Sequence, residues 1–318
     1  MLATKYVTLT HETGEVVQRA PGGYRLPAHV AAAVDLVAPT VHVPGVRRQR
    51  PPHSNESARS SGLGFNTPKN LRELYSVGDA VGKAPANKQA VSAFLRQYYS
   101  RADLQLWWKR YCGGITCGKG LPKLVGDATS GGFAGVEAML DIETVTGVAG
   151  NVESEFWGFA GHSPDNPSNE PFMKFLARVS GTGDEDVPRL FSTSYGEDEG
   201  SWSYAAARRL NTEFMKAGAR GISLLFASGD EGANCRGGKF LPEAPGSSPY
   251  VTAVGGTAPA PGFPSPGSES AIGLSSGGFS SRWPMPPWQQ GAVAAYLGQP
   301  GLPPASRGYN ASGRAYPD

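Results

Sequence analysis

The 318-residue sequence has neither a long apolar run nor an excess of charge of one sign. No apolar stretch approaches the roughly 20 residues that a helix needs to cross a bilayer, so we expect no membrane span. Lys and Arg number 29 against 27 Asp and Glu, for a formal net charge of +2. Nucleic-acid-binding domains usually carry a dense basic stripe. The one basic cluster here, residues 47–50, lies among prolines and serines, so we expect no nucleic-acid partner.

Cysteine and histidine are also scarce. Cys112 and Cys117 are close enough in sequence for a local disulfide, which leaves Cys235 as an odd cysteine. In a secreted chain an odd cysteine suggests a missing partner; the alternative, a buried thiol in a cytosolic chain, is slightly favoured by composition. No His-x-x-x-His or Cys-x-x-Cys spacing occurs, so no zinc site is expected.

The N-terminus lacks the parts of a signal peptide, so either the protein is cytosolic or the sequence does not begin at the true start.

Glycine and proline are abundant, with 43 and 27 residues, and indicate a loop-rich globular protein. Apolar periodicity stops over residues 46–61, where Pro, Ser and Arg dominate, and this composition is typical of an exposed linker. We therefore predict an N-terminal region over residues 1–45, a linker over 46–61 and a main domain over 62–318. The basic residues of the linker would make it an easy target for proteases.

The apolar pattern predicts alternating helices and strands in the main domain. Residues 1–45 are expected to form a strand, a turn, a short helix and a strand. Thr67 is predicted to cap a helix whose first residue is Pro68, and residues 88–110 are predicted to add more helix. Further helices are expected over 135–150, 169–180 and 203–221, and strands over 154–161, 189–196, 222–228 and 248–257. Apolar strands that alternate with helices predict an α/β fold, a parallel sheet with helices on both faces.

Two acids, Glu137 and Asp141, lie in the small, apolar segment "GVEAMLD". Four helical residues rotate about 400°, so the two side chains point about 40° apart, on one face. Like charges at this spacing repel, and the apolar neighbours predict a wholly buried helix, which makes each charge costlier. Solvent-facing acids are the alternative. Buried acids without a nearby Lys or Arg are more often functional, and we therefore predict a functional pair.

A third acid, Asp230, follows the apolar strand predicted over 222–228. The carboxyl ends of parallel strands are where α/β sheets bind ligands, although Asp230 could equally cap a turn. The segment "GLSSG", residues 273–277, matches a nucleophile elbow, but that site needs a histidine further along the chain. His162 is the last histidine, so "GLSSG" is predicted to be a loop.

Six segments occur in the order found in sedolisins, the serine-carboxyl peptidases: "GVEAMLD", "STSYGEDE", "NTEFMKAGARGISLLFASGDEGANC", "SSPYVTAVGGT", "SSGGFS" and "NASGRAYPD". The resemblance extends from Lys5 to Asp318. It implies a subtilisin-like parallel sheet, incomplete in this chain and preceded by the end of an α+β propeptide domain. Residues 1–45 resemble the end of the propeptide, and the linker then contains the maturation cleavage region.

The resemblance also implies the roles of individual residues. Glu137 would be the general base in place of histidine, Asp141 would orient it, and Asp230 would stabilise the oxyanion. Glu197 resembles a further acid beside the substrate. The segments Ser194-Tyr195-Gly196 and Ser276-Gly277-Gly278 would bind peptide backbone by strand addition.

The glutamate base implies an acidic workplace. A histidine with a pKa of about 6.5 would be only ~1% neutral at pH 4.5, whereas a glutamate near 4.3 would be largely ionised. Two close carboxyl groups that share one proton also avoid double ionisation. We therefore expect a lysosome or a comparable acidic or secretory compartment. The sequons at Asn55 and Asn310 agree with a secretory route.

The chain departs from the family in one important respect. The family's nucleophile lies in a Gly-Thr-Ser-Ala-Ser segment well after "GRAYPD", so a fragment that ends at Asp318 is expected to be inactive alone. The resemblance also implies calcium, with ligands beyond Asp318 and none in this chain, and places the partner of Cys235 there too.

The expected substrates are peptides or proteins, and the expected partner is the protein's own propeptide. The expected activity is the release of tripeptides from free N-termini, and cleavage at internal bonds stays open as an alternative. A non-catalytic family member that binds peptides is the first alternative. A glycosidase is a weaker one, because two acids on one helix do not readily flank a sugar.

Overall fold

The computed structural model describes residues 2–318 except 13, 15, 44–65, 130–133 and 260–268. The predicted linker over 46–61, with its sequon at Asn55 and its cleavage region, lies outside the described residues. None of the described helices is long and apolar enough to span a membrane.

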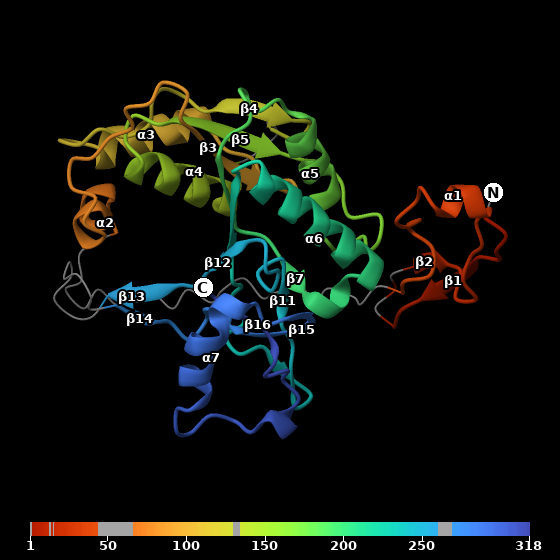
Figure 1. The fold of residues 1–318 in the computed structure, drawn as a ribbon. Helices are drawn as coiled ribbons and strands as arrows, with labels where there is room; N and C mark the ends of the chain where they lie inside the picture. The colour runs from red at the N-terminus through yellow and green to blue at the C-terminus, as the bar shows by residue number, and fades with distance from the viewer. Residues whose placement is uncertain (1, 13, 15, 44–65, 130–133, 260–268) are drawn as a thin grey trace.

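A six-stranded sheet forms the centre of the main domain (Figure 1). Every neighbouring pair of strands in it is parallel, which confirms the predicted α/β class. Its strands, in spatial order, are β12 (Thr252–Val254), β8 (Ser223–Ala227), β6 (Leu190–Thr193), β3 (Lys88–Ala93), β5 (Glu153–Gly158) and β4 (Lys123–Gly126). Because all six strands run the same way, their carboxyl ends share one edge of the sheet.

Helices cover both faces of this sheet, as predicted. On one face, α3 (Arg101–Tyr111) and α4 (Val136–Val148) pack over a cluster that contains Leu104, Ile142 and Phe156. On the other face lie α5 (Phe172–Gly181) and α6 (Tyr204–Ala219). The larger cluster is rich in buried aromatic rings, among them Trp157, Phe172, Phe175, Phe191, Phe214 and Phe226. Burying one such side chain contributes about 1.5–3 kcal/mol, so these two layers hold the sheet rigidly.

The prediction of helix over residues 88–110 is wrong in its first part. Residues 88–93 form β3, a central strand, and helix begins only at Arg101. Ala90, Val91 and Ala93 are buried because helices cover both faces of the strand. A short apolar run of this kind fits a buried helix and a buried strand equally well, and only the neighbouring strands β5 and β6 decide between them.

Local sequence signals predict the helix ends more reliably than they distinguish a buried strand from a buried helix. Helix α2 (Pro68–Leu74) has the predicted cap, because Thr67 Oγ1 accepts a hydrogen bond from the N–H of Asn70 at 3.2 Å. Ser203 Oγ likewise accepts from the N–H of Ala206, at 3.1 Å, at the start of α6. Beyond the end of α6, Gly221 has a φ of +72°, a value that glycine adopts without strain.

Short antiparallel pairs complete the main domain. Strand β7 (Glu197–Asp198) pairs with β11 (Glu243–Ala244), and β15 (Gly278–Pro284) pairs with β16 (Gly313–Tyr316). The remaining short elements are the hairpins β9 (Cys235–Arg236) with β10 (Lys239–Phe240) and β13 (Thr257–Pro259) with β14 (Glu269–Ala271), together with the 3-10 turns η1 (Glu199–Ser201), η2 (Pro287–Gln289) and η3 (Ala305–Arg307) and helix α7 (Gln290–Leu297).

The N-terminal region forms a small lobe beside α6 (Figure 1). It consists of a hairpin, β1 (Val7–Thr10) with β2 (Val16–Arg19), followed by the short helix α1 (Ala28–Ala31). The strand predicted after that helix is not formed among the described residues, where the chain to residue 43 has only turns and bends. Asp35 forms a 2.7 Å ion pair with Arg209 of α6, and His42 Nε2 lies 3.1 Å from the carbonyl oxygen of Ser201.

Candidate active site

The carboxyl edge of the sheet gathers the predicted site segments. Ser194 follows β6, and Asp230 follows the neighbouring strand β8 after Ser228 and Gly229. Strand β3 lies on the other side of β6, and the segment after it contacts the start of α4, because the N–H of Gly135 donates to the carbonyl oxygen of Tyr98 at 2.8 Å. This is the edge at which α/β sheets usually bind ligands.

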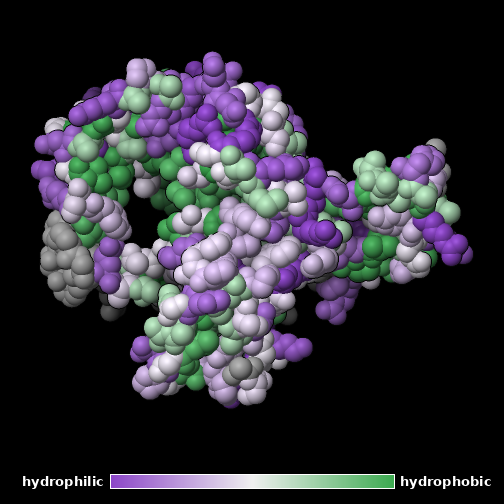
Figure 2. Space-filling model, in the orientation of Figure 1, coloured by the Kyte–Doolittle hydropathy of each residue, from purple (hydrophilic) through white to green (hydrophobic). Residues whose placement is uncertain are grey.

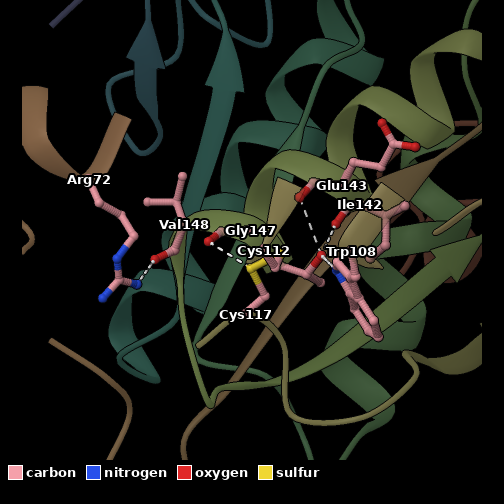
Figure 3. Close-up of a disulfide and its surroundings, with 9 residues drawn as sticks. Arg72, Trp108, Cys112, Cys117, Ile142, Glu143, Gly147 and Val148 are labelled. Atoms are coloured by element: carbon pink, nitrogen blue, oxygen red, sulfur yellow. Dashed lines mark hydrogen bonds between the residues drawn. A yellow bond between two sulfur atoms is a disulfide. The ribbon is translucent and has the colours of Figure 1, made fainter. Parts of the chain in front are cut away.

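Helix α4 is anchored at its far end. Arg72, which is buried, donates from Nη1 to the carbonyl oxygen of Val148 at 2.7 Å, and a cation at a helix C-terminus is favourable (Figure 3). Trp108 Nε1 donates to Thr146 Oγ1 at 3.0 Å. The Cys112–Cys117 disulfide, which confirms the predicted pairing, places Cys117 Sγ 3.6 Å from the carbonyl oxygen of Gly147. These contacts hold the helix while its first turns face the sheet edge.

The first turns of α4 are less buried than predicted. Val136 is 85% exposed and Leu140 is 57% exposed, so the prediction of a wholly buried helix is wrong. Only one side of α4 packs on the sheet, through Ala138, Ile142 and Thr146. Figure 2 shows a hollow between α4 and the β13–β14 hairpin, with hydrophobic residues around it. Glu137 is partly exposed in the first turn, where the positive end of the helix dipole stabilises a carboxylate.

Asp141 lies one helical turn after Glu137 in α4. Burial raises the pKa of Asp141 to about 7, the Ser194 hydrogen bond opposes that rise, and the charge of Glu137 adds to it. Ser194 Oγ donates to Asp141 Oδ1 at 2.8 Å. The charge of Glu137 thus couples the two acids electrostatically. In mildly acidic solution the raised pKa favours a protonated Asp141.

Tyr195 lies against the same pair. Its ring packs edge-on against Phe94, with the centroids 5.1 Å apart. Burial raises the pKa of Tyr195 well above its ordinary value, and the charges of Asp141, Glu137 and Glu170 raise it further. The segment Ser194-Tyr195 therefore lies close to the two acids: Ser194 is hydrogen-bonded to Asp141, and Tyr195 interacts electrostatically with both acids.

A second cluster surrounds Asp230, which is exposed. The preceding residue, Gly229, has a φ of +110°. Ser276 Oγ accepts a hydrogen bond from the N–H of Glu231 at 2.9 Å and donates to Glu243 Oε1 at 2.7 Å. The "GLSSG" segment is therefore a loop, as predicted, and it supports the turn that carries Asp230. Its central serine does not occupy a nucleophile elbow.

The other predicted cleft residues lie next to this cluster. Gly196 packs so closely on Ala244 that a Cβ atom would lie 2.7 Å from its carbonyl oxygen, and Glu197 pairs with Ala244 in the β7–β11 ladder. Gly277 donates from its N–H to the carbonyl oxygen of Gly232 at 3.3 Å, and Gly278 begins β15. Binding of peptide backbone by these segments stays a prediction, as do the roles of Glu137, Asp141, Asp230 and Glu197.

Cys235 is exposed, so the alternative of a buried thiol is wrong. Among the described residues, no group of three or more His, Cys, Asp or Glu side chains is placed to hold a metal ion. Calcium, whose ligands the resemblance places beyond Asp318, stays a prediction.

Two buried acids near these clusters were missed by the sequence reasoning. Glu243 supports the Asp230 turn, and Glu170 acts electrostatically on Tyr195. Each residue stands next to a proline, and Glu170 falls at the start of the helix predicted over residues 169–180. No signal in the sequence distinguishes them from exposed loop acids.

Sequence comparison finds related proteins over almost the whole chain. Tripeptidyl-peptidase 1 of Mus musculus is 39% identical over 312 residues, which are 95% of this chain and 54% of the mouse protein. Tripeptidyl-peptidase 1 of Homo sapiens is 38% identical over 314 residues, 95% of this chain and 54% of the human protein. The chain therefore spans about half the length of these relatives. No protein-family model matches it.

Among solved structures, the chain resembles Pseudomonas sedolisin, a serine-carboxyl proteinase, in complex with two molecules of pseudo-iodotyrostatin. The TM-score is 0.56 at 20% identity, over 79% of this chain and 69% of that chain. This likeness establishes the fold.

Proposed function

The chain belongs to the sedolisin family, close to tripeptidyl-peptidase 1, and we therefore propose that it supplies the base and the oxyanion-stabilising acid of a peptidase that works in acidic solution. Its substrates would be peptides or proteins. Release of tripeptides from free N-termini is the activity we propose, by analogy with the name of these relatives. The nucleophilic serine would come from residues that follow Asp318 in the complete protein.

The coupled pair of Glu137 and Asp141 is the observation that carries this proposal. A general base works best when it is ionised at the operating pH and the group that orients it is not a second charge. Burial keeps Asp141 protonated up to a pH of about 7. The start of α4 favours a charge on Glu137. The pair is thus suited to proton transfer in acid, where a histidine would be protonated and unable to act as a base.

The chemistry follows from this arrangement. The serine oxygen attacks the carbonyl carbon of the peptide, and its proton moves to the Glu137 carboxylate. Asp141 keeps Glu137 oriented through the proton that the two carboxyl groups share. Asp230, in its protonated form, donates a hydrogen bond to the oxygen on which negative charge develops. Glu137 then gives the proton to the amine nitrogen as the peptide C–N bond breaks, which leaves the acyl-enzyme. Water attacks the acyl carbon and gives a proton to Glu137, and Glu137 returns it to the serine oxygen as the acyl–serine bond breaks.

The surroundings of the pair agree with a peptide substrate. The exposed Val136 and Leu140 place an apolar ridge beside Glu137, which suits substrate side chains. The contacts of the N-terminal lobe with α6 agree with a docked propeptide over residues 1–45, and we propose that the chain after it carries the maturation cleavage. Such a zymogen would serve an acidic compartment such as the lysosome.

The test uses the complete protein, recovered from its transcript and activated in acid. Peptides with free and with blocked N-termini should both be assayed between pH 3.5 and 7. We expect hydrolysis in acid, with release of tripeptides only from free N-termini. Glu137→Gln should lower kcat by about 10²–10⁴-fold, because a general base typically contributes that much.

Glu143→Gln is the matched control. This variant removes a carboxylate from the same helix as Glu137. Burial and the charge of Asp103 raise the pKa of Glu143. This variant should keep nearly full activity. Undiminished turnover in Glu137→Gln would remove the proposed base, and a complete protein that binds peptides without cleaving them would favour the non-catalytic alternative.

A further inference from the structure

We infer that Glu243 is a positioning residue that sets the location of Asp230 through Ser276. This inference rests on the proposed function for its catalytic consequence, because Asp230 is the proposed oxyanion donor. Its structural part, the support of the turn over residues 228–231, rests on the contacts alone.

Ser276 links Glu243 to both neighbours of Asp230. Glu243 is 4% exposed, and its Oε1 accepts a hydrogen bond from Ser276 Oγ at 2.7 Å. The same hydroxyl accepts from the N–H of Glu231 at 2.9 Å, and the N–H of Ser276 donates to the carbonyl oxygen of Gly229 at 2.9 Å. Asp230 therefore lies between two backbone groups that one serine holds.

Glu243 also touches this turn directly. A Cβ atom on Gly229 would lie 2.0 Å from Glu243 Oε2, so the carboxylate packs against the backbone just before Asp230. No side chain fits between them. Gly229 has a φ of +110°, which other residues rarely adopt. The turn thus takes its conformation partly from the presence of the buried carboxylate.

The backbone of Glu243 is itself held in place. Glu243 pairs with Asp198 in the β7–β11 ladder, and its N–H donates to the hydroxyl of Tyr316 at 2.7 Å. Strand β7 directly follows Tyr195 and Gly196, beside the coupled acids. Glu243 therefore joins three segments: the one that contacts Asp141, the one that carries Asp230, and the loop of Ser276.

This linkage matters because the side chain of Asp230 is exposed. The backbone turn sets where this side chain starts, and a catalytic group must be held within about 0.5 Å of its productive position. An oxyanion donor has to lie 2.7–3.1 Å from the developing charge, and a displacement of about 1 Å costs about 10²-fold in rate. Loss of the Glu243–Ser276 unit should thus lower kcat more than it changes KM.

The kinetic test compares Ser276→Ala, Glu243→Ala and Glu243→Gln in the complete protein. We expect kcat to fall about 10–100-fold in both alanine variants, with KM within about threefold. The double variant should be no slower than either single one, because the two residues act as a unit. Glu243→Gln keeps a carbonyl acceptor for the serine hydroxyl and should restore most of kcat.

Ser180 and Glu213 supply the matched control. Ser180 Oγ donates to Glu213 Oε2 at 3.0 Å, between α5 and α6 on a face of the sheet. Ser180→Ala removes a serine–glutamate hydrogen bond of the same kind, away from the carboxyl edge. It should leave kcat and KM unchanged. Equal losses in Ser180→Ala and Ser276→Ala would show a general stability effect and overturn the inference.

Hydrogen exchange provides a readout that needs no activity. In Ser276→Ala the amides of residues 229–231 should exchange at least about tenfold faster, and in Ser180→Ala they should not change. If Ser276→Ala does not fold, Ser276→Cys takes its place, with the same expected direction. Unchanged exchange refutes the positioning role. An inactive wild-type protein with faster exchange in the variant would refute the proposed function and leave the positioning role standing.

Discussion

Replacement of Asp141 by asparagine tests the electrostatics of the coupled pair. Burial raises the pKa of Asp141 from its ordinary 3.8 to about 7. The folded protein therefore keeps a proton that the unfolded chain loses as the pH rises above about 4. Below that pH the raised pKa of Asp141 makes its full contribution to the free energy of unfolding, and this contribution is lost as the pH rises to about 7. At about 1.4 kcal/mol per pH unit, the loss amounts to about 4 kcal/mol.

Asp141→Asn removes this titration and keeps an acceptor for Ser194. Urea unfolding of the complete protein should be measured from pH 4 to 7.5, in a background without the nucleophile so that the protein cannot digest itself. We expect the difference in unfolding free energy between the parent and Asp141→Asn to change by about 4 kcal/mol between pH 4 and 7, with the parent favoured at the acidic end.

Ser194→Ala is the control for this measurement. The Ser194 hydrogen bond lowers the pKa of Asp141, so its loss should move the titration to higher pH. Glu137→Gln should move it to lower pH, because the charge of Glu137 raises that pKa. If the difference in unfolding free energy between the parent and Asp141→Asn changes by less than about 1 kcal/mol from pH 4 to 7, the assignment of a buried, protonated Asp141 is refuted.

Two further predictions concern stability and are checked by urea unfolding. Ser203→Ala removes the cap of α6 and should cost about 1 kcal/mol. Thr212→Ala, at a half-buried position within the same helix, should change the free energy of unfolding little, and equal effects of the two variants would argue against the cap. Gly229→Ala forces a Cβ to within 2.0 Å of the Glu243 carboxylate at a φ of +110° and should cost more than about 2 kcal/mol. Its control is Gly218→Ala in α6, which has no atom within 4 Å of the added Cβ and should stabilise the protein by up to about 1 kcal/mol. Tolerance of alanine at Gly229 would contradict the close packing described above.

Local signals in the sequence predicted much of the main domain. The cap at Thr67, the α4 and α6 patterns and the apolar strand before Asp230 each depend on residues a few positions apart, so they are visible without tertiary structure. The same is true of the pairing of Cys112 with Cys117, which five positions separate. The apolar pattern also predicted Asp230 at the carboxyl end of a parallel strand, and Asp230 follows β8 of the parallel sheet.

Other features depended on contacts between distant segments. Residues 88–93 became a strand because β5 and β6 flank them, and the exposure of Val136 and Leu140 follows from the single face that α4 packs on the sheet. The raised pKa of Asp141 required burial by the packed layers, and the hydrogen bond that opposes the rise comes from Ser194, 53 residues away.

Residue types and short spacings by themselves determined which acids this protein carries and on which elements they lie. The tertiary structure decided which of these acids is dehydrated and what supports the turn that carries Asp230. Glu243 and Ser276 are 33 residues apart and meet only in the folded chain. Solvation and hydrogen-bond partners are set by whatever chain packs nearby in space, and no local pattern of residues contains that information.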